Sequence, residues 1–126
     1  MKVILVLILI ATTAMLMTAC KANIKNTESY RSVDVATAKD IISTEDNVVI
    51  LDVRTPSETA NGIVEGAMKI DVLNSSFVDE IAKLDKEKTY VVYCKSGGRS
   101  VRAAKKMLKA GFTNVVNVEG GYTAWK

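Results

Sequence analysis

The stretch TYVVYCKSGGRS, residues 89–100, places a cysteine between a strand and a helix. The β-branched and aromatic run at 89–93 predicts a buried strand that ends just before Cys94. The residues that follow are Lys95, Ser96, Gly97, Gly98, Arg99 and Ser100. A glycine-rich loop at the start of a helix directs backbone amides towards an anion, and such surroundings favour the thiolate form of cysteine. We therefore expect Cys94 to be a reactive thiolate.

Strand and helix patterns alternate on both sides of this stretch. Short apolar runs predict five strands, at 30–33, 48–51, 67–70, 89–93 and 114–118. Apolar residues at helical spacing predict helices at 35–42, 74–84 and 100–110, with single turns at 57–61 and 122–126. The expected helix caps are Asp34, Thr55 ahead of Pro56, and Asn74 or Ser75. This alternation predicts an α/β fold with a mostly parallel, five-stranded central sheet and helices on both faces.

The composition of the chain excludes several kinds of functional site. The chain has 126 residues, which suits one domain, and a formal net charge of +3 with no basic block, which gives no reason to expect nucleic acid binding. It contains no histidine, so Cys–His pairing and histidine-based metal sites are excluded. We expect no metal and no cofactor. The two cysteines, Cys20 and Cys94, are too few for a disulfide framework.

The first residues are typical of a targeting signal. Lys2 precedes a continuous apolar run at 3–10, and small residues then lead to Cys20. A cysteine at this place resembles the bacterial lipobox, which implies a lipoprotein-type signal peptide at 1–19 and lipidation of Cys20. The expected organisation is then a tether at 20–29 and a domain at 30–126, in the cell envelope, lipid-anchored and facing the periplasm or the cell exterior. An uncleaved membrane anchor and ordinary cleavage near Ala19 remain alternatives.

A second strand end carries charged residues. Asp52 and Arg54 close the strand at 48–51, and Glu58 follows in the single turn. Because the carboxyl ends of parallel strands meet at one edge of a sheet, we expect these residues to lie near the Cys94 loop. Their expected role is supporting, with Arg54 paired to Glu58 across the turn so as to fix the wall beside the loop.

Three ordered blocks resemble the single-domain rhodaneses, which are sulfurtransferases. They are LDVRTPSE at 51–58 with Gly62, Gly66 and Ala67 after it, CKSGGRS at 94–100, and GFTNVVNVEGGYTAW at 111–125. The segment 62–67 lacks the His and Pro that are common in the family. The resemblance implies that Cys94 takes a sulfane sulfur from a donor such as thiosulfate, forms a persulfide, and passes the sulfur to a thiol or to cyanide.

The partners expected on this basis are a small anionic sulfur donor, a thiol acceptor and, through the lipid anchor, a membrane. If Cys20 is acylated, no second thiol in the chain can discharge the persulfide, so the acceptor is external. We expect the residues from Lys95 to Ser100 to bind the donor and the sulfur, and we expect a monomer.

Two other functions compete with this one. A phosphatase or an arsenate reductase also uses a cysteine loop that ends in arginine, but such loops have five intervening residues, whereas Cys94 and Arg99 have four between them. The smaller ring suits one sulfur atom better than a phosphate. A non-catalytic rhodanese-like module that carries sulfur or binds a partner is the second alternative.

Overall fold

The computed structural model describes residues 29–126. The expected signal peptide, Cys20 and nearly all of the expected tether lie outside the described residues. In the part that is described, no helix has the length and apolar character needed to cross a membrane.

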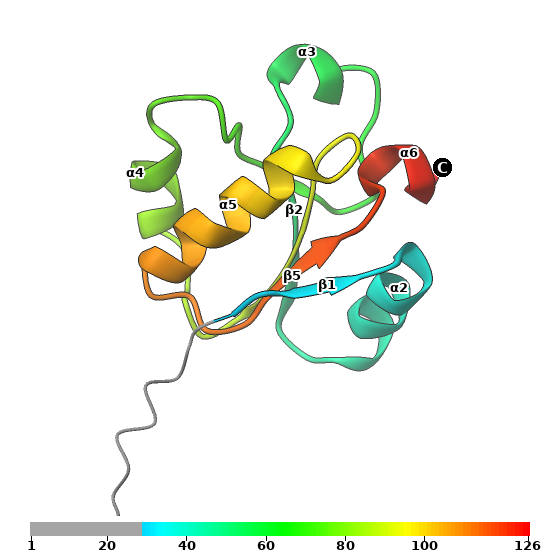
Figure 1. Cartoon of the computed structure of the whole chain (residues 1–126), viewed down its shortest axis with the longest axis horizontal. Coiled ribbons are helices and arrows are strands. Elements are labelled where there is room, and N and C mark those ends of the chain that lie inside the picture. Colours follow the sequence, from blue (N-terminus) through cyan, green and yellow to red (C-terminus); the bar gives the residue numbers. More distant parts are fainter. Residues whose placement is uncertain (1–28) are drawn as a thin grey trace, which may run out of the picture.

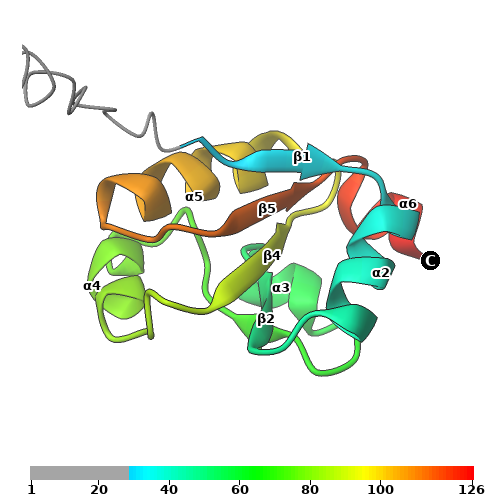
Figure 2. The ribbon, with the colours of Figure 1, turned by 90° about the horizontal axis from the view of Figure 1, so that it is seen from below.

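The chain forms the expected five-stranded sheet, and every strand pair is parallel. The strands are β1 (Arg31–Val33), β2 (Val48–Asp52), β3 (Met68–Lys69), β4 (Thr89–Tyr93) and β5 (Val115–Val118). Their order across the sheet is β1-β5-β4-β2-β3, which Figure 2 shows for the first four strands of that order. The predicted α/β fold is therefore confirmed.

Helices cover both faces of this sheet. They are α2 (Val35–Thr44), α3 (Pro56–Thr59), α4 (Phe77–Ala82), α5 (Gly98–Lys109) and α6 (Gly121–Trp125). One core contains Phe77 and Ile81 of α4 with Met107 of α5, and the other contains Ala38 and Ile41 of α2. Accordingly, α4 and α5 lie on one side of the strands, and α2 and α6 on the other (Figure 1).

Most of the predicted boundaries agree with the structure to within two residues. Asp34 caps α2 as expected, since its side chain accepts a hydrogen bond from the amide of Thr37 at 2.8 Å. Thr55 and Glu58 form a capping box at α3, with Pro56 in the first turn. This capping box fixes the position of the Glu58 side chain.

Two helix starts were predicted wrongly. Helix α5 begins at Gly98, two residues before the expected Ser100, so Arg99 belongs to its first turn. Helix α4 begins at Phe77, and neither Asn74 nor Ser75 is its cap, because Asn74 Oδ1 instead accepts hydrogen bonds from the amide and hydroxyl of Ser76 in a local turn. Asparagine side chains compete in this way with the helix for backbone donors.

Three segments close to Cys94 lie together at one end of the sheet. The loop before α5, the short helix α3 and the start of α6 all occupy the end of the sheet at which its strands finish (Figure 1). Strand β4 leads into this region and is buried along its whole length. A rigid, central strand thus holds Cys94 at the edge where parallel sheets commonly form their sites.

Candidate active site

Cys94 is the first residue of the short loop between β4 and α5. The residue is only 1% exposed, and the amide of Gly97 donates a hydrogen bond to its Sγ at 3.0 Å. Gly97 has a φ of +121°, a conformation that residues with a Cβ rarely adopt, and this turns its amide back towards the sulfur. The loop therefore presents a backbone donor to Cys94, as the glycine pattern predicts.

The surroundings of Cys94 favour its thiolate. Burial raises the pKa of the thiol, but hydrogen bonds from Ser100, Gly97 and Ser96 outweigh burial, and the net pKa lies below its ordinary value. The start of α5 adds its helix dipole, which also favours negative charge. These contacts therefore favour the thiolate, which is the nucleophilic form of cysteine.

Arg99 does not point at the sulfur as a free cation. Its Nη1 and Nη2 atoms donate to Glu58 Oε1 and Oε2 at 2.6 and 2.8 Å, a bidentate ion pair between α5 and α3. The hydrogen bonds from Arg99 lower the pKa of Glu58 to about 2. This pair therefore ties the first turn of α5 to α3.

The predicted pair between Arg54 and Glu58 is wrong. Arg54 Nη2 lies 2.7 Å from Asp52 Oδ2, and the same nitrogen donates to the carbonyl of Gly62 at 2.7 Å. Residues two apart in an extended chain point to the same side, which brings Asp52 and Arg54 together. Both are buried, at 0% and 5% exposed, and the hydrogen bond that the Arg54 side chain donates to Asp52 raises the pKa of Arg54.

Tyr93 completes this buried cluster, although no motif or spacing in the sequence pointed to it. Its hydroxyl donates to Asp52 Oδ2 at 2.5 Å and accepts from the amide of Val64 at 3.0 Å. The ring also lies beneath the Arg54 guanidinium, whose Cζ is 5.7 Å from the ring centroid. The cluster thereby joins β2 and β4 to the segment after α3, and the supporting role expected of Asp52 and Arg54 has a structural basis.

Helix α6 closes the other side of the loop. The amides of Tyr122 and Thr123 donate to the carbonyls of Cys94 and Lys95, at 2.8 and 3.1 Å. A Cβ added at Gly121 would lie 2.4 Å from the carbonyl oxygen of Cys94, so only glycine permits this approach. The closing block of the sequence therefore holds the Cys94 loop directly.

Two hollows lie near this end of the sheet. The first, about 200 Å³, adjoins the loop, and its walls include Lys95, Lys126, Tyr122 and Glu58. Because Glu58 is already paired with Arg99, the lysines leave this hollow with excess positive charge. A small anion would find its countercharges there.

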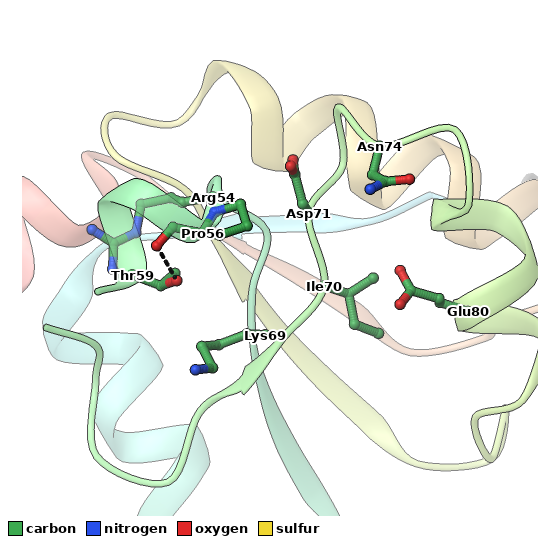
Figure 3. Close-up of a pocket in the computed structure, with 8 residues that line it drawn as sticks. All are labelled: Arg54, Pro56, Thr59, Lys69, Ile70, Asp71, Asn74 and Glu80. Atoms are coloured by element: carbon green, nitrogen blue, oxygen red, sulfur yellow. Dashed lines mark hydrogen bonds between the residues drawn. The ribbon is translucent and has the colours of Figure 1, made fainter. Parts of the chain in front are cut away.

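The second hollow, about 260 Å³, lies between α3, β3 and α4 (Figure 3). Lys69 lines it together with two carboxylates, those of Asp71 and Glu80. It carries no excess of positive charge and does not include the Cys94 loop, so it is the less suitable hollow for an anionic donor. Within residues 29–126, no group of acidic or cysteine side chains is arranged to hold a metal ion.

The sequence analysis also missed Asn117, which is 3% exposed and hydrogen-bonded to Ser100 at 2.6 Å. An asparagine inside the apolar run of β5 could have been noticed, because a buried amide needs partners.

Comparisons with known proteins agree with this geometry. A family model described as "Rhodanese-like domain" matches residues 34–126. The sequence is 38% identical over 111 aligned residues to Protein HIGH ARSENIC CONTENT 1, mitochondrial, of Arabidopsis thaliana, and the match covers 80% of this chain and 64% of that protein. It is 35% identical over 104 residues to Thiosulfate sulfurtransferase 16, chloroplastic, of the same plant, covering 75% of this chain and 85% of that protein.

A solved structure has the same fold. The crystal structure of a rhodanese-like domain protein from Staphylococcus aureus superposes with a TM-score of 0.66 at 32% identity, covering 76% of this chain and 91% of that chain.

Proposed function

Because the chain belongs to the rhodanese-like family, we propose that it is a sulfurtransferase that carries a sulfane sulfur on Cys94. The observation that supports this most directly is the loop, in which a backbone amide donates to Sγ at 3.0 Å and the pKa of the thiol is lowered despite burial. Sulfurtransferase names among the relatives support the same class of reaction.

In the proposed first step, the Cys94 thiolate attacks the outer sulfur of a small anionic donor such as thiosulfate. A bond forms between Sγ and that sulfur, the sulfur–sulfur bond of the donor breaks, and sulfite leaves with its electron pair. In the second step the thiolate of an external acceptor, or cyanide, attacks the outer sulfur of the persulfide. Cys94 leaves as a thiolate, so the cycle needs no added oxidant or reductant.

The chain's own residues would serve this cycle in three ways. Gly97 and the start of α5 stabilise the sulfur anion before and after transfer. Lys95 and Lys126 supply positive charge in the hollow beside the loop for an incoming anion. Glu58 and Arg99 hold the helix start so that the loop keeps its shape.

The pairing of Arg99 disfavours phosphatase or arsenate reductase chemistry. Those reactions need an arginine that is free to bind a tetrahedral oxyanion, whereas both terminal nitrogens of Arg99 donate to Glu58. This pairing supports a role of Arg99 in positioning the loop, in addition to the donor-binding role that we expected from the sequence. A non-catalytic carrier module shares the same site and must be separated by experiment.

Intact-protein mass after incubation with thiosulfate tests the proposal. We expect a gain of one sulfur atom that disappears when a thiol is added and is absent in Cys94→Ser. Thiocyanate formation from thiosulfate and cyanide would then separate an enzyme from a carrier, since a carrier would load sulfur without turnover. If no sulfane donor leaves an adduct on Cys94, the proposed chemistry is excluded.

We also propose that Cys20 carries a lipid and anchors the domain in the cell envelope, on the strength of the signal-like residues that precede it. Labelling of cells with an alkyne fatty acid should mark the wild-type protein and leave Cys20→Ser unmarked. Equal labelling of both proteins would contradict the anchor.

A further inference from the structure

A line of polar side chains runs from the buried Cys94 through Ser100 and Asn117, which are also buried, to the exposed Ser32 on the edge strand of the sheet. Cys94 Sγ lies 3.5 Å from Ser100 Oγ, Ser100 Oγ lies 2.6 Å from Asn117 Oδ1, and Asn117 Nδ2 lies 3.1 Å from Ser32 Oγ. Asn117 and Ser32 face each other in register across β5 and β1. The mechanism proposed above uses Cys94 and its amide donors and assigns no role to Asn117 or Ser32.

The direction of these hydrogen bonds suits a thiol. The S–H group donates to Ser100, the Ser100 hydroxyl donates to Asn117, and the Asn117 amide nitrogen donates to Ser32. A serine hydroxyl has a single proton. While that proton points to Asn117, Ser100 presents only lone pairs to the sulfur.

A thiolate requires the opposite direction. It has no proton to give, and it is stabilised by hydrogen bonds that it accepts. Ser100 can supply one by turning its hydroxyl to the sulfur, and a group that then donates to Ser100 Oγ strengthens this hydrogen bond and holds the hydroxyl in that direction. Rotation of the Asn117 carboxamide by half a turn provides this, because its nitrogen and oxygen are nearly equal in size. Ser32 is a hydroxyl on an exposed position, so it can accept in one arrangement and donate in the other.

We propose that Asn117 is a positioning residue that, held by Ser32, reverses the Ser100 hydrogen bond when Cys94 ionises and so stabilises the thiolate. The inference deepens the proposed function and rests on it for the importance of that thiolate. No proton passes along the line, because the thiol proton leaves to solvent or to a base in solution and the side chains only reorient.

The line itself contains no charged group. Charged groups beside the loop include Lys95, which follows Cys94, and Lys126 and Arg54, which line the same hollow. Arg99 of α5 is paired with Glu58 of α3 and also interacts electrostatically with Asp71, which follows β3. These charges lie at the loop and on its α3 side, whereas Asn117 approaches Ser100 from the sheet. A substitution at Asn117 therefore changes the hydrogen bonding of Ser100 without altering the ion pair.

The test measures thiolate formation in the full chain, independently of sulfur transfer. Alkylation of Cys94 by iodoacetamide is followed from pH 5 to pH 10 on the tryptic peptide that spans residues 89–95, which separates Cys94 from Cys20. The rate reports the thiolate fraction. In Asn117→Val, Ser100 can still donate to the Gly97 carbonyl, 3.0 Å away, but receives no donor when it turns to the sulfur. We expect the rate of alkylation at pH 7 to fall about fivefold, which is the effect expected when one neutral hydrogen bond is lost.

A double-mutant cycle with Ser100→Ala distinguishes positioning from general loosening of the structure. Since Asn117 acts through Ser100, its substitution should have no further effect on the pH profile in the Ser100→Ala background. The matched control is Asn114→Asp, at the other end of β5, where the side chain donates to Thr89 instead. Its profile should match that of the wild type.

A second variant covers the case in which Asn117→Val does not fold. Asn117→Asp keeps the shape of the side chain but, once ionised, only accepts, so alkylation at pH 8 should slow by about tenfold or more. A wild-type profile in either folded variant would overturn the inference, as would a shift that persists undiminished without the Ser100 hydroxyl. If the wild-type protein takes up no sulfur while these variants still show the altered pH profile, the proposed function is rejected and the positioning role of Asn117 is retained.

Discussion

Replacing Tyr93 by phenylalanine removes one oxygen from the buried cluster beneath the active-site end of the sheet. That oxygen donates to Asp52 at 2.5 Å and accepts from the amide of Val64 at 3.0 Å. Tyr93 is 0% exposed, so water does not take its place. The substitution leaves a carboxylate with one donor fewer and a backbone amide without an acceptor.

The magnitude follows from these two losses. A hydrogen bond to a charged group contributes about 1.5–3 kcal/mol, and an unsatisfied buried amide costs about 1–3 kcal/mol. Because Asp52 keeps its bonds from Arg54, we expect the sum of the two losses to lie near the lower end of these ranges, about 3 kcal/mol. The free energy of unfolding should fall by that amount, and the midpoint temperature should fall by more than about 10 °C.

Tyr90→Phe is the matched control. Tyr90 lies in the same strand and is 1% exposed, but its hydroxyl makes a single bond, at 2.6 Å, to the carbonyl of Asp85. Its loss should cost about 1 kcal/mol. Urea unfolding followed by circular dichroism and by the fluorescence of the single tryptophan, Trp125, compares the two variants. If Tyr93→Phe is no more destabilised than Tyr90→Phe, the buried cluster does not hold the segment as argued.

Three further results are expected. Because Cys94 is 1% exposed, folding should slow its reaction with a bulky maleimide more than its reaction with iodoacetamide, each rate being compared with that of the unfolded protein, and equal maleimide rates before and after unfolding would contradict its burial. The pKa of Glu58 is lowered from 4.5 to about 2, so its pairing with Arg99 stabilises the fold fully above pH 4.5, and this contribution is lost as the pH falls through about 2. The free energy of unfolding of the wild type should exceed that of Glu58→Gln by about 1 kcal/mol at neutral pH, and this difference should vanish on acidification. A difference that grew on acidification would refute the assignment. Gly121→Ala should lower the unfolding free energy by more than Gly66→Ala does, because both have positive φ but only Gly121 faces a backbone oxygen, at 2.4 Å from an added Cβ.

Much of the fold was predictable because its signals are local. The buried strand β4 is a continuous apolar run, and the glycines after Cys94 mark the turn into α5. The helix start at Gly98 was missed because glycine is a poor helix former, and only the hydrogen-bonded loop around Cys94 favours a helix there. The start of α4 was missed because the Asn74 side chain bonds to its own turn.

The side-chain pairs of the site were less predictable, since they join residues far apart in the chain. Glu58 and Arg99 are 41 residues apart, and so are Tyr93 and Asp52. The wrong pairing of Arg54 with Glu58 came from choosing the nearest opposite charge along the turn. In the structure the extended end of β2 directs Arg54 back to Asp52, while the capping box turns Glu58 towards α5.

The sequence by itself determined the class of fold and the place of Cys94 between a strand and a helix, because strand periodicity, helix spacing and glycine turns are properties of neighbouring residues. Only the tertiary structure decided which charges meet and how Cys94 is supported. The parallel sheet brings β2, β4, β5 and β1 together at one edge, and this places Ser100, Asn117 and Ser32 in a line from the sulfur. Hydrogen bonds depend on distances of a few tenths of an ångström, which the chain acquires only when its core is packed.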